Sequence, residues 1–287
     1  MVTMRNPYEI ETPAVISFSG GRSSGFMLWN IIQAYGGTLP EDIKVIFCNT
    51  GLEHHETYEF IHRIEQEWCP VIWLEYDERK VTKEVQRDDG LDVVTVTKAH
   101  HKLVDYHTAS RSGEPFEQVI NYKSYLPNPV TRFCTQELKI KLSDRFMKEI
   151  SEEYTNCVGL RADEQKRVSR LKGRKVRVKL DVCAPMAEAG HTREDVMNFW
   201  NGHPLDLKLP LDSNIFGNCV GCFLKGYSKL EAIAEKEPEQ MDFWIRMEEK
   251  TGNTFRIDRP KYFVIKRDAH KQLAFDFGDT IDCFCTD

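Results

Sequence analysis

AVISFSGGRSSGFM, residues 14–27, joins an apolar strand to a turn of small residues and then to a helix. A strand, turn and helix of this kind directs backbone N–H groups and the positive end of the helix dipole at one point, which suits a phosphate or pyrophosphate. Gly20 and Gly21 permit the backbone dihedrals and the close approach that such a cradle needs. The neighbouring serines can donate hydroxyl hydrogen bonds, and Arg22 can supply a charged fork. No Gly-Lys-Ser/Thr closes the turn, so it is not a Walker loop.

Strand and helix patterns alternate after this stretch. Residues 45–51 (VIFCNTG) indicate a second buried strand that ends in a turn, residues 56–68 an amphipathic helix, and residues 71–76 a third strand. This order predicts an α/β fold, a Rossmann-like parallel sheet of about five strands flanked by helices. Ligands bind beyond the carboxyl ends of such strands, where the turns at 19–21 and 49–51 would lie.

Composition indicates a globular domain with metal or thiol chemistry. The 287 residues carry a net charge of -6, with 41% hydrophobic and 29% charged residues. The first residues lack a secretory signal pattern and no apolar run reaches membrane-spanning length, so we expect a cytoplasmic protein that does not insert into a membrane. The nine cysteines argue against a disulfide framework, because their number is odd and we expect the chain to be intracellular.

The chain divides into a predicted nucleotide-binding α/β domain, residues 1–204, and a Cys-rich, mainly helical region, residues 205–287, packed on it. Within the first part the pattern weakens between residues 77 and 129, which we interpret as an insertion or a lid. His100, His101 and His107 fall there without partners at ligand spacing, so we interpret them as surface or core histidines. Further on, residues 135–150 predict a helix, 156–161 a strand, and Thr192 with Asp195 a helix start.

Residues 166–179 contain eight Lys or Arg and no acid. Alternation of Val and Leu with charged residues from Val176 to Val182 indicates a strand with a basic face. The run fits a solvated hairpin, a site for a phosphate-rich nucleotide, or a contact with a nucleic-acid substrate.

Four segments, in order, resemble the phosphoadenylylsulfate (PAPS) reductase family of the adenine nucleotide alpha hydrolase (PP-loop) superfamily. They read Ser-Gly-Gly-x-x-Ser at 19–24, Asn-Thr-Gly-x-Glu at 49–53, Cys-Thr-x-x-Leu-Lys at 134–139, and Gly-x-Arg-x-x-Glu-x-x-Arg at 159–167. The resemblance implies that the nucleotide is held by Ser17, Ser19, Gly20, Gly21, Arg22, Ser23, Ser24, Asn49, Thr50, Gly51 and Glu53. It also implies phosphate or catalytic contacts from Arg22, Lys139, Arg161 and Arg167. Ordinary turns and a solvated helix start are the structural alternatives for these segments.

The cysteines resemble cluster ligands of iron-sulfur adenylylsulfate reductases. Cys219 and Cys222 form a Cys-x-x-Cys turn, and Cys134 precedes it by 85 positions. The reductases carry a Cys-Cys pair where this chain has Cys134 alone, so the fourth ligand is Cys183, Cys283 or Cys285, or an open iron site. We predict a 4Fe-4S cluster on Cys134, Cys219, Cys222 and Cys285. Zinc on Cys219, Cys222, Cys283 and Cys285, or a redox thiol pair, is the alternative.

Cys283 and Cys285 lie where the reductases have a mobile nucleophilic cysteine, although the surrounding Glu-Cys-Gly-Leu-His-like motif is missing. Cys48, Cys69 and Cys157 fall in apolar runs and are predicted to be core residues.

The resemblance implies that an intact Ser-Gly-Gly-x-x-Ser loop goes with the splitting of ATP, whereas the reductases have altered loops, so we expect an enzyme that splits ATP, with Mg²⁺, into AMP and pyrophosphate, and so adenylates a substrate for sulfur transfer. One alternative is a PAPS or adenylylsulfate reductase that uses a thioredoxin-like reductant and releases sulfite. Another is a nucleotide-binding module without turnover. The expected partners are an adenine nucleotide, a sulfur donor or reductant, a nucleic acid bound through 166–179, and a second copy of the chain.

Overall fold

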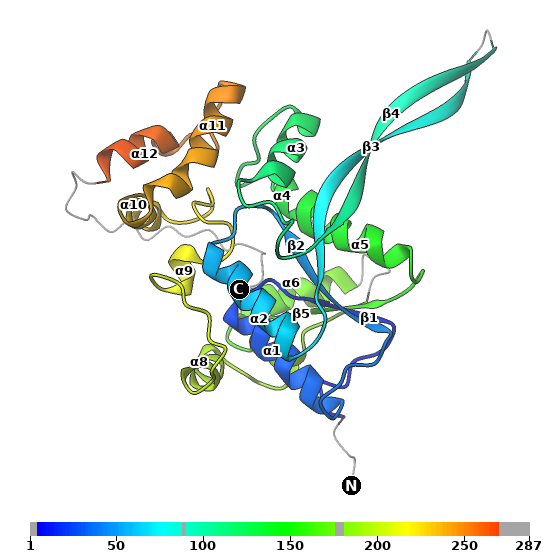
Figure 1. Cartoon of the computed structure of the whole chain (residues 1–287), viewed down its shortest axis with the longest axis vertical. Coiled ribbons are helices and arrows are strands. Elements are labelled where there is room, and N and C mark those ends of the chain that lie inside the picture. Colours follow the sequence, from blue (N-terminus) through cyan, green and yellow to red (C-terminus); the bar gives the residue numbers. More distant parts are fainter. Residues whose placement is uncertain (1–4, 88–89, 176–180, 270–287) are drawn as a thin grey trace.

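The computed structural model describes residues 5–87, 90–175 and 181–269, and a six-stranded sheet lies at its centre (Figure 1). The strand order is β4-β3-β2-β1-β5-β6, and every pairing is parallel except that of β3 with β4. This confirms the Rossmann-like α/β prediction, with one more strand than expected. The strands are β1 Ala14–Ser17, β2 Ile43–Asn49, β3 Ile72–Arg87, β4 Gly90–Val104, β5 Thr155–Val158 and β6 Asp181–Cys183.

Helices cover both faces of the sheet, because successive residues of each buried strand point to opposite sides. In β1, Ile16 packs in the core on one face and Val15 in the core on the other. The first core joins the sheet to α1 (Arg22–Ala34), α2 (His55–Glu67) and α8 (Arg193–Asn201). The second joins it to α5 (Lys141–Lys148), which continues from α4 (Phe133–Thr135) through a π-helical turn, η1 (Gln136–Ile140). Thr192 and Asp195 form the predicted capping box of α8.

The segment that we interpreted as an insertion contains a long β-hairpin and a helix. Strand β3 was predicted to end at Tyr76 but runs to Arg87, and β4 pairs with it antiparallel from Gly90 to Val104. Both strands are rich in β-branched residues, as in VVTVT at 93–97, and charged residues are interspersed along β3, a composition that suits a ribbon with two exposed faces. In Figure 1 the hairpin projects from the body of the molecule. Helix α3 (Glu114–Lys123) follows it.

The basic run is helical where it is described, so the hairpin interpretation is wrong over Gln165–Lys175, which forms α6. Lys and Arg are good helix formers, and Val168 and Leu171 are spaced for one helical face. Residues 176–180, where the basic-faced strand was predicted, lie outside the described residues; Asp181–Cys183 form β6.

The C-terminal part is helical, as predicted. One hydrophobic cluster unites it with earlier segments, since Leu52 and Phe116 pack together with Trp244 and Phe255. The boundary at residue 204 stays a prediction. The remaining helices are α7 Pro185–Glu188, α9 Ser213–Phe216, α10 Tyr227–Lys236, the 3-10 turn η2 Pro238–Met241, α11 Asp242–Thr251 and α12 Tyr262–Asp268.

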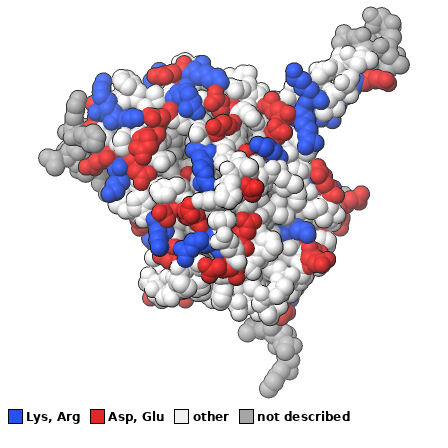
Figure 2. All heavy atoms as spheres, viewed as in Figure 1, with Lys and Arg blue, Asp and Glu red and all other residues white. Residues whose placement is uncertain are grey.

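Charge is mixed over most of the face drawn in Figure 2, with acidic and basic side chains interspersed. Among the described helices, none is both long enough and apolar enough to cross a bilayer.

Candidate functional site

The turn between β1 and α1 is held in one conformation by Gly20. Its φ of +75° lies in the left-handed region, and a Cβ there would sit 2.6 Å from Thr57 and 2.7 Å from Ile61. Both the backbone conformation and the contact with α2 therefore require glycine. The chain leaves β1 pressed against the start of α2, and this contact fixes where α1 begins.

Serine hydroxyls close the turn from inside. Ser24 Oγ accepts a hydrogen bond from the Ser19 amide at 3.3 Å, donates to the Gly21 carbonyl at 3.0 Å and lies 3.0 Å from Ser19 Oγ. Ser24 is fully buried. These contacts account for the spacing of the two serines, because Ser24 reaches back across the turn to Ser19.

The first turn of α1 offers backbone donors to an anion. Gly21 is the N-cap residue and has no side chain to cap the helix, and the first i→i−4 bond is donated by Gly25. The N–H groups before it have no acceptor within the helix, and the helix dipole adds positive potential. They border a cavity of about 220 Å³ whose lining includes Arg161 and Arg193. The described lining contains no carboxylate.

The guanidinium of Arg22 forms hydrogen bonds within the protein. Its Nε and Nη2 donate to the two carboxylate oxygens of Asp206 at 2.7 and 2.8 Å, and Nη2 also donates to the Leu207 carbonyl at 2.6 Å. The Arg22 carbonyl in turn accepts the Trp200 indole N–H at 2.8 Å. Arg22 thus joins the loop to the segment after α8, and its predicted phosphate contact stays a prediction. Asp206 was not among the predicted site residues, because it lies far along the chain from the loop and no local pattern marks it.

Arg161 and Arg167, from the fourth family-like segment, lie beside the loop. Arg161 Nη1 donates to Ser23 Oγ at 2.9 Å, and its guanidinium also contacts Asp163 at 3.1 Å. Arg167 forms an ion pair with Glu164, whose other oxygen lies 3.8 Å from Arg161. The two arginines are therefore brought together around one carboxylate at the end of β5.

A second cavity, of about 1030 Å³, also adjoins the loop. Its volume is that of a large ligand pocket. Ser19 lines both cavities, and the larger one is also lined by Lys139, Arg167 and Arg170. Its apolar wall includes Phe18 just after β1, residues of β2 and Val158 of β5, and residues of α4, η1, α5 and α6 also line it. It lies where the sheet order changes direction between β1 and β5, as expected for a nucleotide site.

Two further residues of this cavity were singled out in the sequence. Ser17 donates its hydroxyl hydrogen to Asn156 Oδ1 at 2.9 Å. Cys48 is only partly buried and lines the cavity, whereas Cys69 and Cys157 are core residues, as predicted. Burial of the thiol group raises the pKa of Cys48 to about 12, so it is a neutral thiol at physiological pH.

Asn49 uses all of its side-chain hydrogen-bonding capacity within the protein. Its amide donates to Glu75 at 2.7 Å and to the Ser110 carbonyl at 2.8 Å, and its oxygen accepts from the Gly51 amide and the Tyr58 hydroxyl at 2.9 and 3.0 Å. Its predicted contact with a nucleotide stays a prediction. The observed role of Asn49 is to shape the turn after β2.

Glu53 closes the same turn and links it to the cysteines. Its carboxylate accepts from Thr50 Oγ1 at 2.9 Å and from the Tyr58 hydroxyl at 3.3 Å. Glu53 also forms an isolated antiparallel bridge with Cys219, and Thr50 Oγ1 lies 3.3 Å from Cys219 Sγ. The second family-like segment and the Cys-x-x-Cys turn are therefore packed directly together.

The Cys-x-x-Cys turn is held by buried donors. The Trp244 indole donates to the Val220 carbonyl at 2.8 Å, and the Tyr262 hydroxyl donates to the Gly221 carbonyl at 2.6 Å. Cys134 and Cys222 are partly buried and pack against the hydrophobic cluster that contains Cys219. Cys183 instead contacts Cys157, with 2.7 Å between the sulfurs, in a different core. Cys283 and Cys285 lie outside the described residues.

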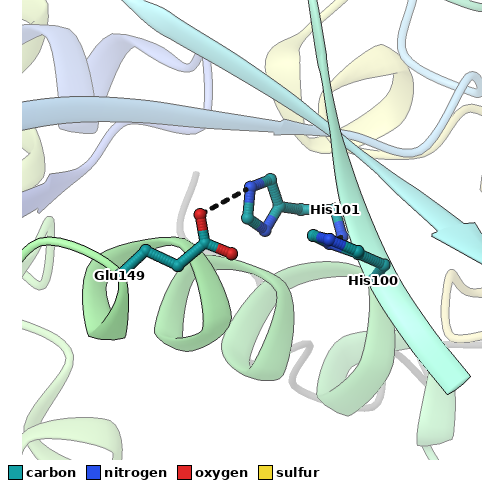
Figure 3. A group of neighbouring side chains, drawn as sticks. All are labelled: His100, His101 and Glu149. Carbon is teal, nitrogen blue, oxygen red and sulfur yellow. Dashed lines mark hydrogen bonds and ion pairs between the residues drawn. The ribbon is translucent and has the colours of Figure 1, made fainter. Parts of the chain in front are cut away.

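His100, His101 and Glu149 form a group whose ligand atoms all lie within 4.8 Å of one another (Figure 3). Sequence spacing could not reveal it, because Glu149 comes from the end of α5. His101 Nε2 lies 3.6 Å from Glu149, and burial lowers the pKa of His101, which favours the neutral ring. His100 Nδ1 already accepts the His101 amide at 2.6 Å. We assign no metal to this group, because Nδ1 of His100 is already occupied by a hydrogen bond from the backbone.

Comparison with known proteins identifies the domain. The model of the phosphoadenosine phosphosulfate reductase domain family matches residues 13–207, about two thirds of the chain. The match spans all four family-like segments and ends just after Asp206. No solved structure matches the chain.

Similar curated proteins come from phages and an archaeon. An uncharacterized nin region protein of Escherichia phage lambda is 28% identical over 226 residues, which is 78% of this chain and 70% of that protein. An uncharacterized 37.8 kDa protein of Escherichia phage 186 is 27% identical over 164 residues, covering 52% of this chain and 48% of that protein. A protein of Methanocaldococcus jannaschii is 36% identical over 66 residues, 23% of this chain and 13% of that protein.

We expect Gly20→Ala to abolish nucleotide binding, because the new methyl group would push the loop away from α2. Gly36→Ala is the matched control, since Gly36 also has a positive φ, of +71°, but a Cβ added there would meet nothing within 4 Å. It should lower the free energy of unfolding by about 1 kcal/mol, the cost of placing alanine in the left-handed region, and leave binding intact. Calorimetric titration with ATP compares the two. Equal affinity in both variants would contradict the assignment of the loop.

Proposed function

Because the chain belongs to the phosphoadenosine phosphosulfate reductase family of the PP-loop superfamily, we propose that it is an enzyme that cleaves ATP between its α- and β-phosphates. In this proposal the loop at 19–24 binds the pyrophosphate portion, and the larger cavity receives the nucleoside. One observation carries the proposal above all. The uncapped N-terminus of α1 borders a cavity lined by the guanidinium groups of Arg161 and Arg193, and this cavity shares Ser19 with the larger one between β1 and β5, where such sheets bind nucleotides.

The intact loop favours ATP over a sulfated nucleotide. The resemblance implies that Ser-Gly-Gly-x-x-Ser goes with pyrophosphate release, whereas reductases, which release none, have altered loops. In this chain both serines contribute hydrogen bonds that hold the turn. The turn is thus arranged before any ligand arrives, and binding costs little ordering entropy.

The reaction transfers an adenylyl group. An oxygen of the acceptor attacks the α-phosphorus, the bond from that phosphorus to the bridging oxygen breaks, and pyrophosphate leaves with its electron pair. Arg161, which contacts Ser23 at 2.9 Å, would stabilise the charge on the leaving group. Lys139 and Arg167 line the larger cavity and would face the α-phosphate. Since the lining of the smaller cavity has no described carboxylate, the phosphates themselves would carry Mg²⁺.

The cysteine arrangement fits an iron-sulfur cluster better than a zinc ion held by the described cysteines alone. Cys219 belongs to one hydrophobic core, and Cys134 and Cys222 pack against it. No group of three described ligand atoms that all lie within 4.8 Å of one another includes these cysteines. Three ligands of one zinc ion would meet that limit, because Zn–S bonds are about 2.3 Å long. Cluster ligands bind different irons and lie farther apart. A bound cluster would supply sulfur or electrons beside the turn after β2.

A paired incubation tests the proposal. Anaerobically purified protein receives ATP and Mg²⁺ in one arm, and PAPS or adenylylsulfate with reduced thioredoxin in the other. We expect AMP and pyrophosphate in the first arm, stimulated by the acceptor where one is present. Sulfite in the second arm alone would make the chain a reductase, and tight ATP binding without turnover would make it a binding module.

Arg161→Ala should lower the rate of pyrophosphate release by roughly 100-fold or more, as loss of a preorganised anion donor does elsewhere. Lys148→Ala is the control, since Lys148 lies on α5 in an exposed pair with Asp144 at 2.8 Å. Equal loss of activity in both variants would show that Arg161 has no special role.

Anaerobic protein should be brown, with the broad visible absorption of thiolate-bound iron, and Cys219→Ser should remove the colour. Cys69→Ser serves as the control, because Cys69 is buried in the other core. Colourless protein that contains zinc and keeps full activity would overturn the cluster assignment.

A further inference from the structure

The β3–β4 hairpin leaves the sheet as a two-stranded arm. Strand β2 pairs with β3 only from Ile72 to Glu75, and beyond Glu75 β3 pairs with β4 alone among the described strands. From Glu78 to Arg87 the arm would span roughly 35 Å at about 3.4 Å per residue. Figure 1 shows it standing clear of the helices. Isolated two-stranded ribbons are marginally stable in water, so an arm of this length calls for a functional explanation.

One side of the arm is basic. Strand register places Arg79 opposite Lys98, Val81 opposite Val96, and Lys83 opposite Val94, and alternation puts all six side chains on the same side. We call these six residues the basic arm face. It contains three cations, three valines and no acid, and Asp77, opposite His100, is the next residue on the same side toward the root of the arm. The other side is mixed, with Glu78, Lys80 and Glu84 among threonines.

The cations of the basic arm face are not neutralised by the described part of the chain. Arg79, Lys83 and Lys98 are exposed, and none forms an ion pair with a described carboxylate. At the root of the arm, by contrast, Lys102 lies 4.0 Å from Glu75. Arg79 and Lys98 are directly opposite each other, and such like-charged pairs destabilise a ribbon. In Figure 2 Lys and Arg side chains lie along the arm, with acidic side chains nearer its tip and at its root, and the net charge of the chain is -6.

We propose that the basic arm face binds duplex DNA. Closely spaced cations with no acid among them suit a polyanion, since each phosphate contact releases condensed counterions. A two-stranded ribbon fits the major groove of B-form DNA, which is about 12 Å wide, whereas the major groove of duplex RNA is too narrow for protein side chains to read. The valines between the cations would lie against the groove. A second copy of the same face would bring cations against cations.

The proposal rests on the arm and does not depend on ATP cleavage. The cations lie on the hairpin, and none of them lines either cavity at the loop. DNA binding and nucleotide chemistry can therefore fail separately in experiments.

Fluorescence anisotropy with a labelled duplex of about 30 base pairs and mixed sequence tests the proposal on the full chain. We expect binding at low salt that weakens steeply between about 50 and about 200 mM NaCl. The variant Arg79→Ala, Lys83→Ala, Lys98→Ala should bind at least roughly 10-fold more weakly. Its log–log salt slope should fall by about three, because each phosphate contact contributes roughly 0.9.

The control variant Lys80→Ala, Lys208→Ala, Lys236→Ala removes three exposed cations away from the basic arm face, so the net charge changes equally. It should keep wild-type affinity and slope. Neither variant should have a lower thermal midpoint or a lower ATP affinity than the wild type, which shows that each has folded.

Three results would overturn the proposal. If both triple variants lost the same affinity for DNA, the loss would come from the change in net charge and not from the basic arm face. Binding to duplex RNA as tight as to duplex DNA would contradict the groove argument. Absence of DNA binding at low salt would refute it outright, whether or not gel filtration shows a dimer that the arm variant alone dissociates.

Discussion

The contact of Gly20 with α2 is the constraint on which the site depends. With a φ of +75° and Thr57 within 2.6 Å of a Cβ position, the chain has one route from β1 to α1. That route points the first turn of α1 into the smaller cavity and leaves Ser24 inside the turn, where its hydroxyl bonds Ser19. Each later feature, from the arginines of the fourth segment to the cavity beside β1, is arranged around this turn.

Contacts between distant segments complete the site. Arg22 pairs with Asp206 across most of the chain, and Thr50 meets Cys219 across a similar separation. The first contact ties the loop to the segment after α8, and the second places the Cys-x-x-Cys turn against the turn after β2. If both turns border a bound nucleotide, the cysteine chemistry would take place beside the activated phosphate. This proximity gives a physical reason for combining the two motifs in one chain.

The sequence allowed prediction of features that local patterns encode. The parallel α/β sheet follows from apolar strands that alternate with helices, and the capping box of α8 follows from Thr192 and Asp195. The proximity of Arg161 to the loop was expected from the family resemblance, and the structure places its guanidinium 2.9 Å from Ser23. In these cases the decisive residues are close in sequence or belong to a motif of known order.

Other features depend on the tertiary structure and had no local signal. The side chain of Arg22 forms an ion pair with Asp206. The side-chain amide of Asn49 donates hydrogen bonds to Glu75 and to the carbonyl of Ser110. The segment that contains the arm was interpreted only as an insertion or a lid, because its hydrophobic pattern is weak. The pattern is weak because both faces of the arm are exposed, which removes the usual contrast between apolar and polar positions. The basic run was interpreted as a hairpin because strand-like alternation at 176–182 outweighed the helical spacing before it.

The most direct test of the account is a crystal structure with an ATP analogue whose α–β bridging oxygen is replaced by a methylene group. We predict its β- and γ-phosphates at the N–H groups of the first turn of α1, within reach of Arg161, and its nucleoside in the cavity beside β1 and β5. Phosphates bound elsewhere, with the 19–24 turn empty, would contradict the assignment of the site and the proposed reaction with it.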